Sequence, residues 1–300
     1  MNGPRPNSRD LVSLDHVGLV GHNLGTMISA YRQLGFSPTE PRSLLQHDAA
    51  SGAETSLEQR SAHLMFKSGY VELSAVDSRD AGHHLATYAQ RYEGLHILAL
   101  GVPDADDAAR RLRARGLAIT EPSIAARDVA YGERSGVARF RWFMLTPRVS
   151  PEALICCVQQ LTPDIVHQRA VQSHFNGAVQ LLSATLVTSD ARQGAALLGD
   201  IANVAVSADS EGWCVPLRHG QVIVRSPAQF ARVYAGTALP ERSGLAAMTI
   251  GVHSLSALTQ LGTDATVPIR CAAGRSWIEP TFAAGALVEF VESVSEEPPR

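Results

Sequence analysis

Two histidines occupy matching places in two similar stretches of the sequence. His16 lies in residues 14–20 (LDHVGLV) and His96 lies in residues 94–100 (GLHILAL). If two such stretches face each other across a cavity, their imidazoles can bind one divalent metal ion. A single strand histidine is more often a hydrogen-bonded core residue, but a matched pair followed by a strand carboxylate favours a metal site.

A third ligand is expected from Glu72, which lies in the otherwise apolar run YVEL at residues 70–73. Burying an unpaired carboxylate is costly, and a metal ion would satisfy it. Gln159 lies at the corresponding place in the second stretch and is a candidate for a weak fourth ligand or a substrate contact, although a structural role is favoured and this alignment can slip by one or two positions. Such a set suits iron, manganese, zinc or nickel acting on bound oxygens. In an isomerase or lyase, Glu72 could leave the metal and act as the catalytic base.

Other candidate residues have weaker support. His83 and His84 are expected at the solvated start of a helix. Arg141 and Trp142 share a strand on which only one of them can face a cavity, and Arg141 is expected outside. No role is assigned to the histidines that lack a matched partner, namely His47, His63, His167, His174, His219 and His253.

The elements that would position these residues follow one repeated order. The strands at 14–20 and 94–100 each precede a helix; the first helix stops at Gly35, and the second runs from the N-cap Asp104 to Gly116. The histidine is 19 residues from the terminating glycine in the first unit and 20 in the second. Apolar, β-rich runs complete each unit, so both are predicted as a strand, a helix and then two or three antiparallel strands.

The second half repeats this order with weaker agreement. We therefore predict an α+β fold of four βαβββ modules, in two pairs that form cupped mixed sheets. Residues 11–166 are the predicted metal-bearing pair, residues 178–294 a degenerate pair without metal ligands, and residues 167–177 the linker. Thr185 and a residue near Thr249 stand where the second pair would need histidines, so a second metal site is not expected.

Several further segments carry expectations. Residues 42–60 and 121–136 are rich in polar residues and are predicted to be loops beside the mouth of a pocket. Residues 296–300 are predicted to be a frayed tail. Glu289 lies in a run that echoes the one around Glu72, and it is expected to face solvent.

Composition excludes several classes of protein. The 300 residues are 45% apolar and 18% charged, which is typical of a globular protein, and the net charge of −3 offers no broad positive field for nucleic acid. Lys67 is the only lysine, and no glycine-rich phosphate loop ending in Gly-Lys occurs. A secretory signal and a stretch of membrane-spanning length are both missing, so a cytoplasmic protein without membrane contact is expected. Its four cysteines are expected to be reduced core residues.

The segments LDHVGLV, YVELSAV and GLHILAL, with their intervening helices, resemble the vicinal oxygen chelate superfamily. That group includes glyoxalase I, extradiol dioxygenases and the fosfomycin- and bleomycin-resistance proteins. The runs at 159–164 (QQLTPD) and 176–178 (NGA) are similar to its glyoxalase-like branch. The resemblance covers most of the chain, more closely up to about residue 180.

The resemblance implies paired modules around a metal, with ligands at His16, Glu72 and His96, and with Gln159 where family members carry a carboxylate. The leading hypothesis is a metal-dependent glyoxalase-like or dioxygenase-like enzyme, whose small substrate chelates the metal through vicinal oxygens. One alternative is a protein of the bleomycin-resistance type that sequesters a small molecule without chemistry, and another is a scaffold that only mediates assembly. The expected partner is a small-molecule substrate, and a homodimer is compatible with the sequence.

Overall fold

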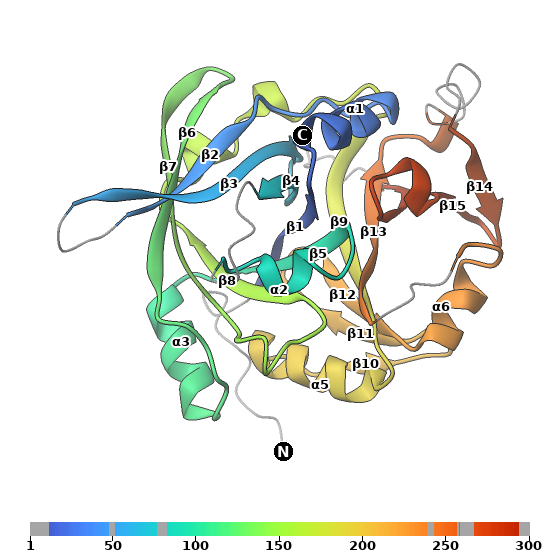
Figure 1. Cartoon of the computed structure of the whole chain (residues 1–300). Coiled ribbons are helices and arrows are strands. Elements are labelled where there is room, and N and C mark those ends of the chain that lie inside the picture. The colour runs from blue at the N-terminus through green and yellow to red at the C-terminus, as the bar shows by residue number, and fades with distance from the viewer. Residues whose placement is uncertain are drawn as a thin grey trace, which may run out of the picture.

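One order of elements, β-α-β-β-β, occurs four times along the chain (Figure 1). The structure, a computed structural model, describes residues 12–47, 52–76, 83–238, 243–256, 258 and 267–293. The first unit consists of β1 (Ser13–Gly21), α1 (Leu24–Gln33), β2 (Arg42–His47), β3 (Glu54–Met65) and β4 (Tyr70–Val76), and α2 (Ala86–Ala89) leads to the next. The second unit consists of β5 (Gly94–Gly101), α3 (Ala105–Ala114), β6 (Ser123–Tyr131), β7 (Arg134–Met144) and β8 (Leu154–Gln160).

The second half of the chain contains the other two units. After α4 (Pro163–Val166) and the 3-10 helix η1 (Arg169–Val171), the third unit consists of β9 (Ala178–Val187), α5 (Ala191–Ala202), β10 (Ser207–Ala208), β11 (Trp213–Pro216) and β12 (Gln221–Arg225). After α6 (Pro227–Val233), the fourth consists of β13 (Gly244–Val252), helical residues at 255, 256 and 258, β14 (Ile269–Ala272), β15 (Arg275–Ile278), the 3-10 helix η2 (Pro280–Phe282) and β16 (Leu287–Glu292). This order confirms the predicted α+β class of tandem βαβββ modules.

The first two long helices begin and end as their sequences predict. Asn23 caps α1 and Asp104 caps α3, each by accepting a hydrogen bond from the backbone N–H three residues further on (3.0 and 2.8 Å). Gly35 and Gly116 follow the two helices with positive φ angles of 79° and 81°, a conformation that glycine adopts without the steric cost of a Cβ. The chain can therefore turn sharply after each helix.

The first two modules close into a barrel in the strand order β1-β4-β3-β2-β6-β7-β8-β5. Within each module the first and last strands pair in parallel, β1 with β4 and β5 with β8, and the antiparallel β1–β5 pair joins the modules on one side. The β2–β6 pair closes the barrel on the other side. Side chains alternate between the barrel interior and its outer surface along each strand.

The prediction that residues 42–60 and 121–136 are loops is wrong. Most of these residues belong to β2, β3, β6 and β7. The polar residues of these strands face either solvent or a partly polar barrel interior. Their sequences therefore lack the alternation of apolar and polar residues that marks a strand.

The third and fourth modules form an open sheet of eight strands, in the order β10-β11-β12-β9-β13-β16-β15-β14. As in the barrel, the first and last strands of each module are parallel, β9 with β12 and β13 with β16. Figure 1 shows this sheet beside the barrel, with β9 and β13 next to β1 and β5.

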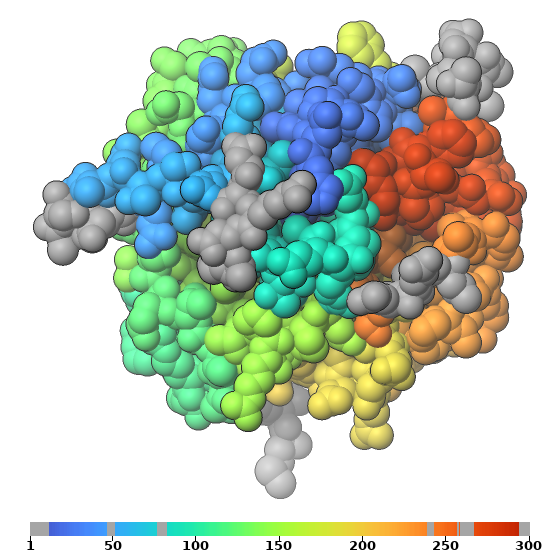
Figure 2. All heavy atoms as spheres, viewed as in Figure 1, coloured from blue at the N-terminus to red at the C-terminus, as the bar shows by residue number. Residues whose placement is uncertain are grey.

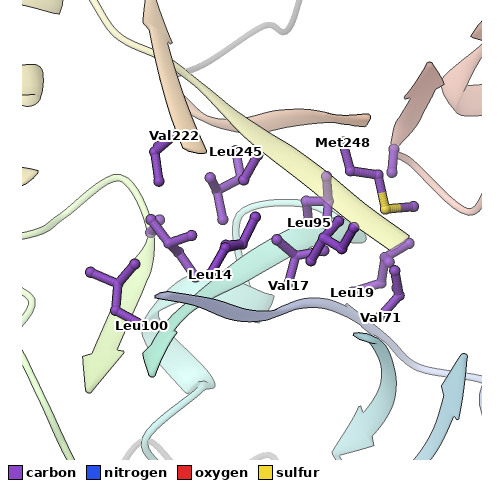
Figure 3. Packing of buried hydrophobic residues seen from close by; sticks show 14 of the residues in the cluster. Leu14, Val17, Leu19, Val71, Leu95, Leu100, Val222, Leu245 and Met248 are labelled. Carbon is purple, nitrogen blue, oxygen red and sulfur yellow. The ribbon is translucent and has the colours of Figure 1, made fainter. Parts of the chain in front are cut away.

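The barrel and the second sheet share one hydrophobic core. Figure 3 shows Leu14 and Val17 of β1 and Leu95 of β5 gathered with Leu245 and Met248 of β13. All five are at most 3% exposed. Burying one such side chain contributes roughly 1.5–3 kcal/mol. The outer face of the barrel at β1 and β5 is therefore covered by the second half of the chain.

Backbone hydrogen bonds also join the two halves. The N–H of Leu14 donates to the carbonyl of His219, and the N–H of Lys67 donates to that of Val179 (both 2.9 Å). On the face shown in Figure 2, the residues around α2 lie against the C-terminal segment, where Gly285 contacts the backbone of Gly94.

The predicted linker at 167–177 is tied to the barrel. The backbone N–H of Asn176 donates to the carbonyl of Gly35 (3.1 Å), and its side chain donates to that of Leu34 (2.9 Å). Asn176 is fully buried.

The predicted tail at 296–300 lies outside the described residues. Within the described parts, none of the helices has both the length and the apolar character needed to cross a membrane.

Candidate functional site

The barrel encloses a cavity of about 80 Å³ between its two modules. Its polar wall comes from the first module and includes His16, Gln59, Ser61, His63 and Glu72. Its apolar wall comes mainly from the second module and includes Ile97, Phe140, Leu154, Cys156 and Val158.

His16 is fixed on β1 by its own neighbour in the sequence. Its Nδ1 lies 2.7 Å from Oδ1 of Asp15, and its ring stacks on Tyr70 with centroids 4.4 Å apart. The register of the β1–β5 pair shifts at Asp15, and this bulge allows the adjacent side chains to touch. Nε2 of His16 is left facing Glu72, whose Oε2 is 3.4 Å away.

Glu72 is held from behind on β4. Its Oε1 accepts hydrogen bonds from Nε2 of Gln59 (2.8 Å) and from the hydroxyl of Ser74 (2.5 Å). Gln59 also donates to Oγ of Ser74, so the three side chains form a closed set (2.9 Å). Oε2 is the oxygen of Glu72 that remains directed at His16.

The charge on Asp15 decides what can lie between Nε2 of His16 and Oε2 of Glu72. Burial alone would raise the pKa of Asp15, but the hydrogen bond and positive charge of His16, with a hydrogen bond from Gln160, outweigh it and hold that pKa below its ordinary value. Asp15 is therefore an anion that accepts Nδ1–H. In a neutral ring Nε2 then carries a lone pair that faces the Glu72 carboxylate. Two acceptors at 3.4 Å need a proton or a metal cation between them.

The structure does not bring His96 to this cavity. Its Nε2 donates to the carbonyl of Tyr92 (2.7 Å), and burial lowers the pKa of His96 to about 4. Its Nδ1 has no partner among the described residues. His96 is the extra residue of a bulge in β5, and the next residue, Ile97, turns into the cavity instead.

The structure aligns the two modules with a sequence offset that differs by one residue from the predicted offset, which matched His16 with His96. In the β1–β5 pair, Asp15 is the extra residue of one strand and His96 that of the other, so the twofold relation matches Asp15 with His96 and His16 with Ile97. Gly18 lies beside the side chain of Ile97. A Cβ added at Gly18 would be only 2.7 Å from Cδ1 of Ile97. The small residue thus makes room for this side chain.

The counterpart of Glu72 is Cys156. Glu72 lies opposite Gly18 in the parallel β1–β4 pair, as Cys156 lies opposite Ala99 in the β5–β8 pair. Burial raises the pKa of the Cys156 thiol well above its usual range, so it stays protonated.

Gln159 lies outside the cavity lining. Its Oε1 accepts a hydrogen bond from the N–H of Ala105 at the start of α3 (3.1 Å). The next residue, Gln160, is the one directed to the site, and it donates to Oδ1 and Oδ2 of Asp15 (3.2 and 3.1 Å).

His63 is a cavity residue that the sequence reasoning missed. It is the register partner of Glu72 in the β3–β4 pair, and its ring meets the edge of Tyr70 at 5.5 Å. Burial, with the nearby charges of Arg127 and His16, lowers the pKa of His63 well below its ordinary value. The ring is therefore neutral at pH 7.

Two other predictions, and one residue that the sequence did not single out, concern the cavity walls. Trp142 lines the cavity, while Arg141 points outward and pairs with Asp106 (2.7 and 2.8 Å), as expected. His84 also lines the cavity, and burial lowers its pKa to about 3, so its predicted solvation is wrong. Arg127 of β6 was missed because it lies in a segment that reads as a loop.

The second sheet contains a carboxylate at the place that corresponds to Glu72. Glu289 is 2% exposed, so its predicted exposure to solvent is wrong. Its Oε1 accepts from Arg275 (2.7 Å), and its Oε2 accepts from Tyr234 (3.0 Å) and Thr249 (2.8 Å). Glu289 and Thr185 line a second cavity, on the second sheet, and none of the described residues that line it is a histidine.

No cluster of three or more His, Cys, Asp or Glu side chains with the arrangement of a metal site occurs in the described parts of the chain. Of the four predicted ligands, His16 and Glu72 are the pair whose donor separation of 3.4 Å fits one ion, since ligand atoms about 2.0–2.2 Å from a shared metal lie roughly 3 to 3.5 Å apart. The predicted ligands His96 and Gln159 do not join them.

Comparison with known structures shows the same architecture. A hypothetical protein from Staphylococcus aureus aligns over 94% of this chain and 100% of its own, with a TM-score of 0.64 and 10% identity. The Mn(II)-bound glyoxalase from Novosphingobium aromaticivorans aligns over 95% and 83% (TM-score 0.57, 13% identity). A variant of 4-hydroxymandelate synthase from Streptomyces coelicolor aligns over 94% and 93% (TM-score 0.57, 12% identity). At these identities the similarity concerns the fold alone.

Sequence comparison identifies the family. No curated protein matches the chain. The family model described as a glyoxalase-like domain matches residues 14–201, which is more than half of the chain and includes the whole barrel. The predicted resemblance to the glyoxalase-like branch is thus confirmed, and the chain belongs to the glyoxalase-like domain family.

Proposed function

We propose that the barrel cavity is the active site of a metal-dependent enzyme that acts on a small, oxygen-rich substrate. The observation that carries this proposal is the 3.4 Å approach of Nε2 of His16 to Oε2 of Glu72, with each group fixed from behind by hydrogen bonds. A carboxylate behind a histidine is the usual support of a metal ligand. The Mn(II)-bound glyoxalase of the same fold supports the choice of a divalent ion.

His16 and Glu72 would hold the metal, and two neighbouring oxygens of the substrate would complete its coordination. The bound ion would supply Lewis acidity toward those oxygens. Asp15 fixes the tautomer of His16, and Gln59 and Ser74 fix Glu72. In a lyase or isomerase reaction Glu72 would leave the metal, and its Oε2 would then be the atom that accepts a proton from the substrate, because Oε1 already accepts two hydrogen bonds.

The reaction type depends on which metal is bound. Iron or manganese would admit dioxygenase chemistry, whereas zinc, which has no redox chemistry, would restrict the site to lyase or isomerase reactions.

One observation favours the alternative function, a binding protein that sequesters a small molecule. Ile97 and Cys156 occupy the second-module positions that match His16 and Glu72, so at these positions only the first module supplies proposed metal ligands. A cavity with one polar and one apolar wall can hold a ligand without transforming it.

Metal content distinguishes the two functions. The protein, purified without chelator and then incubated with Mn²⁺, Fe²⁺, Zn²⁺ or Ni²⁺, is measured by elemental mass spectrometry beside His16→Ala and Glu72→Gln. We expect one ion per chain in the wild type, loss in both variants, and unchanged occupancy in the matched control His96→Ala. A wild type that takes up none of these ions, or a His16→Ala variant that keeps full occupancy, contradicts the metal enzyme and leaves the binding protein.

A further inference from the structure

Arg127 is a buried cation that forms no ion pair with any residue the structure describes. It lies on β6, lines the cavity and is only 2% exposed. Neither Nη1 nor Nη2 has a hydrogen-bond partner among the described residues, and no described carboxylate forms an ion pair with it. A buried charge without a partner is strongly destabilising. An arginine that stays charged in such a place must therefore find its counter-charge outside its own protein surroundings.

Other arginines in the same chain are neutralised by protein carboxylates. Arg225 is 4% exposed and lies 3.4 Å from Oε2 of Glu211, and Arg141 forms a bidentate pair with Asp106. Arg127 differs from both.

The surroundings of Arg127 leave its hydrogen-bonding edge available. Its Cζ lies 5.6 Å from the ring centroid of Phe140, a cation–π contact that supports the guanidinium. Its charge acts on His63, Tyr70 and His167, of which none is an anion at neutral pH. The indole N–H of Trp142, on the same cavity wall, is a second donor with no acceptor among the described residues.

From this arrangement we infer that the ligand of the barrel cavity is a small monocarboxylate, whose two oxygens are bound by Arg127. The inference rests on the proposed function only in placing the ligand in that cavity, and it does not depend on the metal. A guanidinium presents two parallel N–H groups that match the two oxygens of a carboxylate. The apolar wall formed by Phe140 and Ile97 suits the hydrocarbon part of such an acid.

A monocarboxylate fits the charge of the cavity better than a phosphate does. One negative charge neutralises Arg127, whereas a dianion would leave a surplus negative charge in the same barrel as Glu72 and Asp15.

The test compares acids with their neutral amides. The full-length protein is titrated with butyrate and with phenylacetate, and in parallel with butyramide and phenylacetamide, while ligand proton NMR signals report binding. We expect each acid to bind at least about tenfold more tightly than its amide, the range of a charge-assisted hydrogen-bond pair. Equal affinity of acid and amide, or no binding of either acid, overturns the inference.

Two variants assign the effect to Arg127. Arg127→Met should reduce the affinity for the acids about 10- to 100-fold, to the level of the amides, because it removes the cation and keeps the length of the side chain. The matched control Arg141→Met, on the outer surface, should bind the acids as the wild type does. Acid binding that survives in Arg127→Met, or inorganic phosphate binding more tightly than either acid to the wild type, contradicts the proposed ligand class.

His16→Ala separates this inference from the proposed function. It should lose metal and still prefer acids to amides. A wild type that binds metal but does not prefer acids would contradict the carboxylate inference alone. A wild type that prefers acids but takes up no metal would contradict the metal enzyme alone.

Discussion

Ile97 is the counterpart of His16. The two residues occupy equivalent places in the first strands of the barrel modules, and both side chains enter the same cavity. In the same way Cys156 is the counterpart of Glu72. The first module therefore lines the cavity mainly with polar side chains, and the second module lines it mainly with apolar ones. Pseudo-symmetric modules have thus kept their shape while carrying different chemistry.

The first prediction follows from that relationship. Ile97→His would direct a second imidazole into the cavity opposite His16 and add a third protein ligand. We expect the affinity for Zn²⁺ or Mn²⁺ to rise at least about tenfold, measured by isothermal titration calorimetry. The control Ile97→Gln, which is polar and close to histidine in volume but has no ring nitrogen, should not show this gain; an unchanged affinity in Ile97→His would contradict the assigned register.

Asp15 should set the affinity of His16 for metal. Asp15→Asn removes the charge that holds Nδ1–H, so the ring loses its fixed orientation. We expect metal affinity to fall about 10- to 100-fold, in the same titration. The control is Asp106→Asn, because Asp106 is exposed and contacts Arg141 on the outer surface. If Asp15→Asn binds metal as the wild type does, Asp15 has no orienting role.

The buried His96 should make the protein sensitive to acid. Burial lowers its folded-state pKa to about 4, below the ordinary value of 6.5, so the unfolded chain binds the proton more readily. The contribution of the neutral, buried His96 to the free energy of unfolding is therefore complete above pH 6.5, and it is lost as the pH falls toward 4. In this window one such group reduces the free energy of unfolding by about 1.4 kcal/mol for each pH unit.

His96→Gln should therefore lose less stability than the wild type between pH 6.5 and 4.5, as measured by urea unfolding at each pH. Gln retains a donor for the Tyr92 carbonyl. His22→Gln is the matched control, since the His22 side chain is 74% exposed and the slope should not change. Identical slopes in His96→Gln and the wild type would show that His96 is not a neutral buried group.

Gly285 should be essential to the contact between the two halves. It has a φ of 87°, and a Cβ there would lie 2.9 Å from Cα of Gly94 and inside the contact distance of the Glu93 carbonyl. Because both obstacles are backbone atoms, Gly285→Ala should cost about 3 kcal/mol in the free energy of unfolding. Gly274→Ala has a similar φ of 77° and no atom within 4 Å, so about 1 kcal/mol is expected. Equal losses in urea unfolding would contradict the tight contact at Gly285.

The fold could be predicted from the sequence because its signals are local. Apolar strands, the capping residues Asn23 and Asp104 and the terminating glycines each depend on a few neighbouring residues. The first-module pair His16 and Glu72 could be found for the same reason, since a polar residue in an apolar strand is visible without a structure.

The second-module side of the cavity could not be predicted in the same way. A bulge changes the face of every later residue, and nothing in residues 94–100 marks one. The different distances from His16 to Gly35 and from His96 to Gly116 were a usable signal. Aligning the glycines would have matched His16 with Ile97.

Arg127 escaped detection for another reason. The run Ala125–Arg127–Val129 alternates regularly into the barrel, but an arginine between small residues indicates an exposed segment when no ligand is known. The role of Arg127 depends on which residues surround its guanidinium, and those residues come from other strands.

The shared core has a consequence for how this chain can change over time. If it were divided near residues 167–177, the barrel would keep its cavity but expose a wall of leucine and valine side chains to water, and such a fragment would aggregate. The two halves must therefore be inherited together. In the strands that cover the barrel, substitutions are constrained by volume and shape, which leaves the side chains on the opposite face of that sheet free to acquire a chemistry of their own.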